Sequence, residues 1–242
     1  GTKSIYSFFK KKIKKKVFFF DNLDLNFHLN FIFIKKLKNT CFIIVSKSGN
    51  TLETLTIFNL LFSKNLKKSG LVFITETQDS SLISLANKLN AEVIEHPSFV
   101  GGRYSVLSEV GMFPASLMGL DINKFRNLKI LMKNKNFSST LIQNVASINT
   151  LISQGINNSV IFSYDSNLHD LGYWYQQLVA ESLGKNGKGI TPMLSFGPKD
   201  HHSLLQLYLD GPQNKFFTFF KPMNNNKKNV RLNYVIEAQY KA

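Results

Sequence analysis

The clearest indication of the fold comes from the stretch Cys41-Phe42-Ile43-Ile44-Val45-Ser46-Lys47-Ser48-Gly49-Asn50-Thr51-Leu52-Glu53-Thr54. Its first five residues are apolar and rich in β-branched side chains, which is typical of a buried strand. The apolar run stops at Ser46, and from residue 51 to residue 63 apolar side chains recur near helical spacing. A strand that passes through a short polar turn into a helix predicts an α/β fold with a parallel sheet.

The same alternation continues on both sides of this stretch. Because strand-like runs alternate with helix-like runs, we expect parallel sheets covered by helices. The order predicts one α/β unit, a helical connector and the beginning of a second α/β unit. The strand-like runs are residues 16–20, 71–74, 91–94, 159–164 and 215–220, and the helix-like runs are residues 80–89, 106–118, 123–152, 168–183 and 201–209.

The composition excludes several classes of protein. With 43% hydrophobic residues in 242, the chain can bury a core, so wholesale disorder is excluded. Its one cysteine, Cys41, cannot form an internal disulfide, which excludes a disulfide-stapled secreted scaffold and favours a reducing, cytoplasmic setting. Cys41 lies in the apolar run, so we expect it to be buried and inert. No apolar run approaches the roughly 18–20 residues of a membrane span, and we therefore expect no membrane partner.

The net charge of +15 raises the possibility of nucleic-acid binding. Nearly all of this charge is lysine, and the arginines are Arg103, Arg126 and Arg231. Because direct readout of bases relies on arginine forks, the pattern favours a lysine-coated, solvated surface over a specific nucleic-acid site. A basic nucleic-acid binder stays a competing hypothesis, which strong salt dependence of duplex binding would support.

The polar turn between residues 46 and 51 is a candidate anion site. The first N–H groups of the following helix have no intrahelical acceptor and attract anions. Serine and threonine hydroxyls and Lys47 add donors and charge, which suits a phosphate monoester. The local pattern is equally typical of an ordinary turn with a polar helix cap. The segment is not a P-loop, because the terminal Gly-Lys-Ser/Thr is missing.

Four segments in the same order resemble motifs of the glucose-6-phosphate isomerase family: residues 46–54, 99–105, 177–189 and 196–207. The first also resembles the sugar-phosphate loop of a sugar isomerase (SIS) domain. The resemblance implies two SIS domains, each a three-layer αβα sandwich with a doubly wound parallel sheet. It also implies interconversion of glucose 6-phosphate and fructose 6-phosphate without metal or organic cofactor, in a homodimer.

The resemblance assigns three catalytic residues. Glu181 would be the base that moves a proton between C1 and C2. Arg103 would stabilise the negative charge of the enediolate. His202 would carry the proton for ring opening, with the adjacent His201 as the alternative if the match is shifted by one residue.

The substrate-binding residues follow from the same match and from helical spacing. Gln177 and Glu181 are four residues apart, which places them on one face of a helix. We expect Ser48, Arg103, Glu181 and His202 to line one cavity, unless His202 serves the partner subunit's site. The predicted substrate-binding residues are Ser46, Lys47, Ser48, Thr51 and Gln177.

The resemblance also predicts the domain organisation. Residues 1–122 would form a first SIS domain that lacks its N-terminal strand, residues 123–157 a helical connector, and residues 158–242 a partial second SIS domain. The family has a Gly-Ser-rich turn upstream and a lysine near its C-terminus that find no match here, so we expect an internal fragment. The alternatives to an active isomerase are a non-catalytic sugar-phosphate-binding SIS module and an inactive truncated isomerase.

Overall fold

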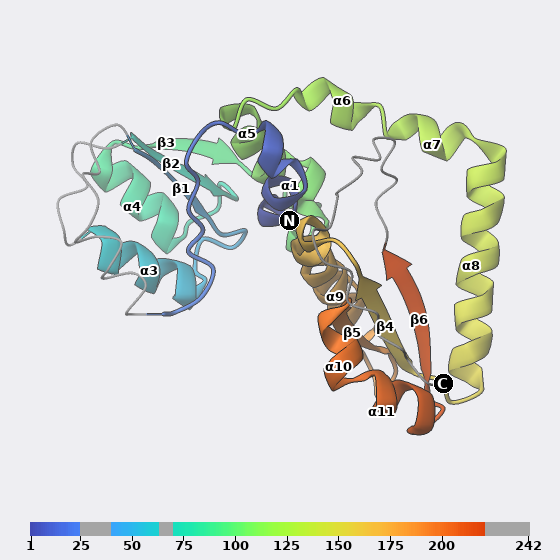
Figure 1. The fold of residues 1–242 in the computed structure, drawn as a ribbon. Helices are drawn as coiled ribbons and strands as arrows, with labels where there is room; N and C mark the ends of the chain where they lie inside the picture. Colours follow the sequence, from blue (N-terminus) through green and yellow to red (C-terminus); the bar gives the residue numbers. More distant parts are fainter. Residues whose placement is uncertain (25–39, 63–69, 221–242) are drawn as a thin grey trace, which may run out of the picture.

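The structure is a computed structural model that describes residues 1–24, 40–62 and 70–220. Two parallel three-stranded sheets, with strand orders β1-β2-β3 and β5-β4-β6, are joined and covered by helices (Figure 1). The predicted parallel α/β fold is confirmed. In chain order the elements are α1 (Thr2–Phe9), η1 (Lys10–Lys12), β1 (Cys41–Val45), α3 (Leu52–Phe62), β2 (Gly70–Thr75), α4 (Ser81–Leu89), β3 (Glu92–Glu95), η3 (Gly102–Leu107), α5 (Glu109–Leu117), α6 (Ile122–Arg126), α7 (Lys129–Lys133), α8 (Lys135–Ser153), β4 (Asn158–Ser163), η4 (Ser166–Leu168), α9 (His169–Leu183), β5 (Thr191–Phe196), α10 (Lys199–Ser203), α11 (Leu205–Asp210) and β6 (Lys215–Phe220).

The first sheet places β2 between β1 and β3. Cys41 pairs with Gly70, and Val72 pairs with Glu92, so all three strands point the same way. Helices α3 and α4 pack against this sheet and exclude water from its apolar side chains. The core they form contains Phe42, Ile44, Ile57, Phe58, Leu61, Phe73, Leu82 and Ala86.

The second sheet places β4 in the centre, where Val160, Ile161 and Phe162 are buried. Helix α9 lies close against β5, because Gly172 presents no side chain there. A Cβ on Gly172 would come within 2.9 Å of Leu194 Cδ2. Helices α10 and α11 follow β5 in the chain and lead back to the start of β6 (Figure 1).

Helices α1 and α5 lie between the two sheets (Figure 1). They share a small core of Ile5, Ala115 and Met118. Helix α1 also contacts α9, since Ser4 Oγ donates a hydrogen bond to the Asp170 carbonyl at 2.6 Å and Ser7 Oγ bonds the Asp170 carboxylate. These contacts join α9, which covers the second sheet, to the helices beside the first.

One predicted strand was wrong, and one strand of the structure was not predicted. Residues 16–20 form no strand, because their apolar side chains are used in packing: Val17 lies against the α1 and α5 core and Phe20 against the core of the first sheet. The unpredicted strand β5 contains Pro192, which is tolerated because β5 pairs only with β4 among the described residues.

The predicted helix over residues 123–152 is three helices. Asp121 accepts a hydrogen bond from the Asn123 N–H, and Asn134 accepts one from the Phe137 N–H, so α6 and α8 each begin at their own polar cap. Cys41, expected to be buried, is exposed because it begins β1, an edge strand of its sheet among the described residues.

The predicted division into 1–122, 123–157 and 158–242 stays a prediction, and residues 221–242 of its last part lie outside the described residues. Within the described ranges, none of the helices combines the length and the apolar character that crossing a membrane requires.

Candidate active site

The polar turn after β1, residues 46–51, contains an internal backbone hydrogen bond and is hydrogen-bonded to β2. The Ser46 N–H donates to the Ile74 carbonyl at 3.1 Å, and the Gly49 N–H donates to the Ser46 carbonyl at 3.2 Å. The Ser46 and Thr51 hydroxyl oxygens are 2.7 Å apart. Two of the predicted phosphate-binding hydroxyls therefore lie together at the carboxyl end of a parallel strand, where ligands of such sheets commonly bind.

Gly49 allows the turn to approach helix α4. It has φ +68°, and a Cβ on it would lie 2.2 Å from Ser80 Oγ. The Gly49 carbonyl accepts from the Leu82 N–H at 3.1 Å, and Asn50 Oδ1 accepts from the Ser81 N–H at 2.9 Å. The turn is therefore held rigidly against the first turn of α4.

Lys47 connects this turn to the segment that precedes Arg103. Its ammonium donates to the Ser98 carbonyl at 2.7 Å and lies 3.5 Å from the Glu76 carboxylate. The Lys47 and Ser48 N–H groups have no protein acceptor within the part of the chain that the structure describes. Lys47 can thus offer an anion its backbone N–H while its side chain fixes a neighbouring loop.

Glu181, on α9, is held between an amide and a guanidinium. Its Oε1 accepts a hydrogen bond from Gln177 Nε2 at 2.9 Å, and its Oε2 lies 3.2 Å from Arg103 Nη1. The carboxylate is 49% exposed, so it stays open to a ligand. The predicted catalytic pair of Glu181 and Arg103 and the predicted binding residue Gln177 are in direct contact.

Arg103 is oriented by three further groups. Its Nε donates to Ser182 Oγ at 2.9 Å, its guanidinium lies 4.9 Å from the centre of the Tyr104 ring, and its carbonyl accepts from Trp174 Nε1 at 2.9 Å. The hydrogen bond to Tyr104 raises the pKa of Arg103. The pKa of Tyr104 is lowered, mainly by its hydrogen bond with Ser182 and then by Arg103.

A cavity of about 310 Å³ adjoins these groups. Ser46, Lys47, Arg103, Gln177 and His96 are among its lining residues. Ser48, Glu181 and His202 are not among the described residues that line this cavity, so the expectation that they share one cavity with Arg103 stays a prediction. Ser48 is exposed, with its hydroxyl accepting from the Asn50 N–H, and Glu181 lies beside the cavity, bonded to Gln177 and Arg103.

His202 is on α10, at the end of the second sheet. Its neighbour His201 is engaged, since the His201 ring contacts the Tyr164 hydroxyl at 2.8 Å and packs on Phe162. Asp200 fixes the start of α10 by accepting from the Phe196 N–H at 2.7 Å. His202 itself is exposed and has no hydrogen-bond partner among the described residues.

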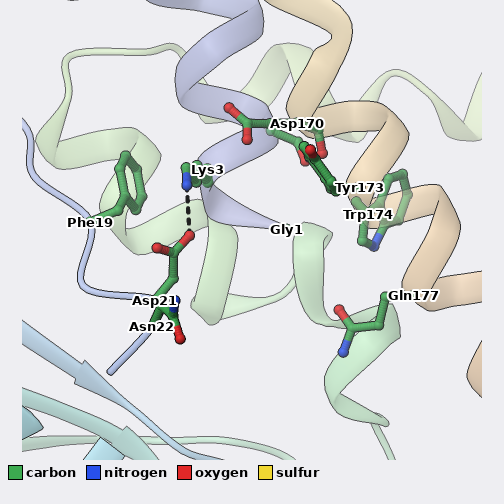
Figure 2. A pocket seen from close by; sticks show the side chains of 10 residues that line it. Gly1, Lys3, Phe19, Asp21, Asn22, Asp170, Tyr173, Trp174 and Gln177 are labelled. Atoms are coloured by element: carbon green, nitrogen blue, oxygen red, sulfur yellow. Dashed lines mark hydrogen bonds and ion pairs between the residues drawn. The ribbon is translucent and has the colours of Figure 1, made fainter. Parts of the chain in front are cut away.

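A second cavity, of about 560 Å³, shares Trp174 and Gln177 with the first. Figure 2 shows these side chains with the ion pair between Lys3 and Asp21, whose atoms are 2.7 Å apart. Gln177 therefore lies where the two hollows meet. Among residues 1–24, 40–62 and 70–220, no three His, Cys, Asp or Glu side chains are grouped to hold a metal ion.

Trp174, Ser182 and His96 also belong to the site, although the sequence motifs assigned them no role. Trp174 lies one helical turn before Gln177 on α9, and Ser182 directly follows Glu181, so helical periodicity places them near the predicted residues. His96 directly follows β3, and a polar residue directly after a parallel strand is typical of a position near the binding site.

Fold and site together describe an α/β protein with parallel sheets and a candidate anion-binding turn at the carboxyl end of a strand. A family model described as phosphoglucose isomerase matches residues 4–239. The chain is also 37% identical, over an alignment of 268 positions, to glucose-6-phosphate isomerase of Methanocaldococcus jannaschii. The alignment covers 100% of this chain and 65% of that relative. The chain belongs to the phosphoglucose isomerase family.

Two solved structures have the same fold. A hypothetical protein from Thermus thermophilus superposes with a TM-score of 0.77 at 26% identity, over 90% of this chain and 55% of that one. A glucose-6-phosphate isomerase from Chlamydia trachomatis superposes with a TM-score of 0.71 at 20% identity, over 90% of this chain and 46% of that one. The chain therefore spans about half to two thirds of the length of the proteins it resembles.

Proposed function

We propose that this protein interconverts glucose 6-phosphate and fructose 6-phosphate. The observation that carries the proposal is the contact of Glu181 with Arg103 and Gln177 beside a cavity that Ser46 and Lys47 also line. A relative 37% identical to the chain bears the name glucose-6-phosphate isomerase, which supports this substrate pair.

In the proposed reaction, the turn from Ser46 to Thr51 binds the phosphate through hydroxyls and N–H groups. Glu181 removes a proton from one of the two carbons C1 and C2 and returns it to the other. Arg103 stabilises the negative charge that develops on oxygen in the cis-enediolate, because its guanidinium is already held in place. Gln177 orients the Glu181 carboxylate and the sugar.

Ring opening is assigned to His202, with proton transfer to the ring oxygen and from the O1 hydroxyl. Since His202 is exposed and forms no hydrogen bond with Glu181 among the described residues, we propose that it acts in the site of a partner subunit of a homodimer. The steps are proton transfers, so we propose no metal or organic cofactor. A cytoplasmic location and the lack of a specific nucleic-acid partner stay predictions.

The test is Glu181→Gln in the full-length protein. The amide keeps the shape of the side chain but cannot accept the substrate proton, so we expect the turnover of fructose 6-phosphate to fall by about 10²–10⁴-fold or more. The Michaelis constant should change little, because the phosphate is held elsewhere. Initial rates of glucose 6-phosphate formation provide the measurement.

Glu92→Gln is the matched control, since Glu92 is an exposed glutamate at the start of β3 and should leave turnover unchanged. Turnover of Glu181→Gln equal to that of the parent would remove Glu181 from the mechanism. A parent protein that binds fructose 6-phosphate in calorimetry but does not convert it would be the non-catalytic SIS module or an inactive truncated isomerase.

A further inference from the structure

His96 is a buried histidine with both ring nitrogens engaged. Its side chain is 1% exposed. The backbone N–H of His96 donates to the Thr75 carbonyl at 2.8 Å, which fixes this residue to the end of β2. Nε2 lies 2.9 Å from the Val100 carbonyl, and Nδ1 bonds the Glu109 carboxyl. A carbonyl can only accept, so Nε2 carries a hydrogen.

These bonds connect three segments that are separate in the chain: the end of the first sheet, the loop between β3 and η3, and the first residue of α5. The loop contains Val100, three residues before Arg103. Breaking the contacts would leave buried polar groups unpaired, which costs more than an exposed hydrogen bond is worth. The loop therefore has one well-defined position as long as His96 and Glu109 are intact.

The loop and the beginning of η3 are each held at one further point. The Lys47 ammonium donates to the Ser98 carbonyl, and Trp174 Nε1 donates to the Arg103 carbonyl. His96 also lines the cavity together with Ser46, Lys47 and Arg103. The pair of His96 and the partly buried Glu109 thus lies at the base of the segment that presents the guanidinium to Glu181.

We infer that His96 and Glu109 are positioning residues for Arg103. This inference rests on the proposed function, in which Arg103 stabilises charge that develops during the reaction. His96 does not touch the reacting atoms in this role. It fixes the Val100 carbonyl, and through the short segment 100–103 the direction of the Arg103 side chain.

The experiment compares His96→Phe, which keeps a ring but removes both hydrogen bonds, with His96→Gln, whose amide can still donate to the Val100 carbonyl. Because misplacement of a charge-stabilising group lowers turnover more than binding, we expect His96→Phe to lower kcat about 30- to 100-fold with KM changed less than about threefold. His96→Gln should recover part of kcat, to within about tenfold of the parent.

Met118→Ala is the matched control, because Met118 is buried in the α1 and α5 core but contacts none of these groups. It should lower the free energy of unfolding without changing kcat. An equal loss of kcat in Met118→Ala and His96→Phe, or an unchanged kcat in a folded His96→Phe protein, overturns the inference. If His96→Phe does not fold, His96→Gln is measured against Met118→Ala by the same criteria.

A second readout does not depend on isomerase activity. Trp174 is the one tryptophan in the chain, and its indole donates to the Arg103 carbonyl. Displacement of Arg103 should therefore shift the tryptophan emission maximum in His96→Phe, less in His96→Gln and not in Met118→Ala. If the parent protein has no isomerase activity, the proposed function fails, and an unchanged emission in both His96 variants separately overturns the positioning role.

Discussion

At the scale of single residues, Ser182 explains the electrostatics around Arg103. Its hydroxyl oxygen accepts a hydrogen bond from Arg103 Nε, so its own hydrogen is free to point at the Tyr104 oxygen, 2.8 Å away. A donor in this position stabilises the phenolate and accounts for the lowered pKa of Tyr104. Ser182 thereby joins the arginine and the tyrosine into one unit.

We predict that Ser182→Ala raises the pKa of Tyr104. The phenolate loses its hydrogen-bond donor, which makes the charged form less favourable, and a higher pH is needed to deprotonate the phenol. NMR titration of protein with ¹³C-labelled tyrosine measures this pKa, with Tyr104→Phe used to assign the signal. An unchanged or lower pKa in Ser182→Ala would contradict the assignment of Ser182 as the donor.

At the scale of elements, the turn between β1 and α3 depends on Gly49. Its positive φ and its close contact with Ser80 allow the turn to dock on α4. A β-carbon there would force both a strained backbone and a displacement of the serine. The same turn carries Ser46 and Thr51, so its position decides whether their hydroxyls meet.

We predict that Gly49→Ala destabilises the protein by about 2–4 kcal/mol, the sum of backbone strain and a clash. Gly119→Ala is the control, because Gly119 also has a positive φ of 84° but has open space where its Cβ would lie. Gly119→Ala should lower the free energy of unfolding only by the backbone strain, about 1 kcal/mol. Urea unfolding at equilibrium measures both free energies. Equal losses would show that the contact with Ser80 contributes nothing.

At the scale of the whole molecule, α9 brings the two sheets into one site. It packs on the second sheet and carries Trp174, Gln177, Glu181 and Ser182, which contact Arg103 or line the cavity beside the first sheet. Helix α1 reinforces this arrangement through Asp170. The site forms because α9 packs on the second sheet and also contacts Arg103 and the cavity beside the first sheet.

We predict that Trp174→Phe increases hydrogen exchange of the backbone amides in η3. Phenylalanine preserves most of the apolar contact but cannot donate to the Arg103 carbonyl, so η3 is held less firmly against α9 and opens more often. Hydrogen–deuterium exchange with mass spectrometry measures the rates. Peptides from α4, which is remote from this contact, are the internal control, and faster exchange there would indicate a general loss of stability instead.

The elements of the fold were largely predictable because each one rests on local chemistry. The strand Cys41–Val45, the helix after it and the helix His169–Leu183 follow from apolar periodicity alone. The errors arose where tertiary packing overrides the local pattern. Residues 16–20 have the composition of a strand but pack by their side chains. Strand β5 forms despite Pro192 because it lies at the edge of the described sheet and pairs there with β4, which is 33 residues earlier in the chain.

Local sequence was enough to predict the parallel α/β class, the polar turn at the end of a strand, the spacing of Gln177 and Glu181, and the family motifs, because these depend on neighbours along the chain. The contacts of Arg103 with Ser182 and Glu181, which are 79 and 78 residues further along the chain, and the burial of His96 against Glu109 depend on long-range packing. Such contacts arise from the packing of α1, α5 and α9 between the sheets, and no local pattern of residues encodes which distant side chains that packing brings together.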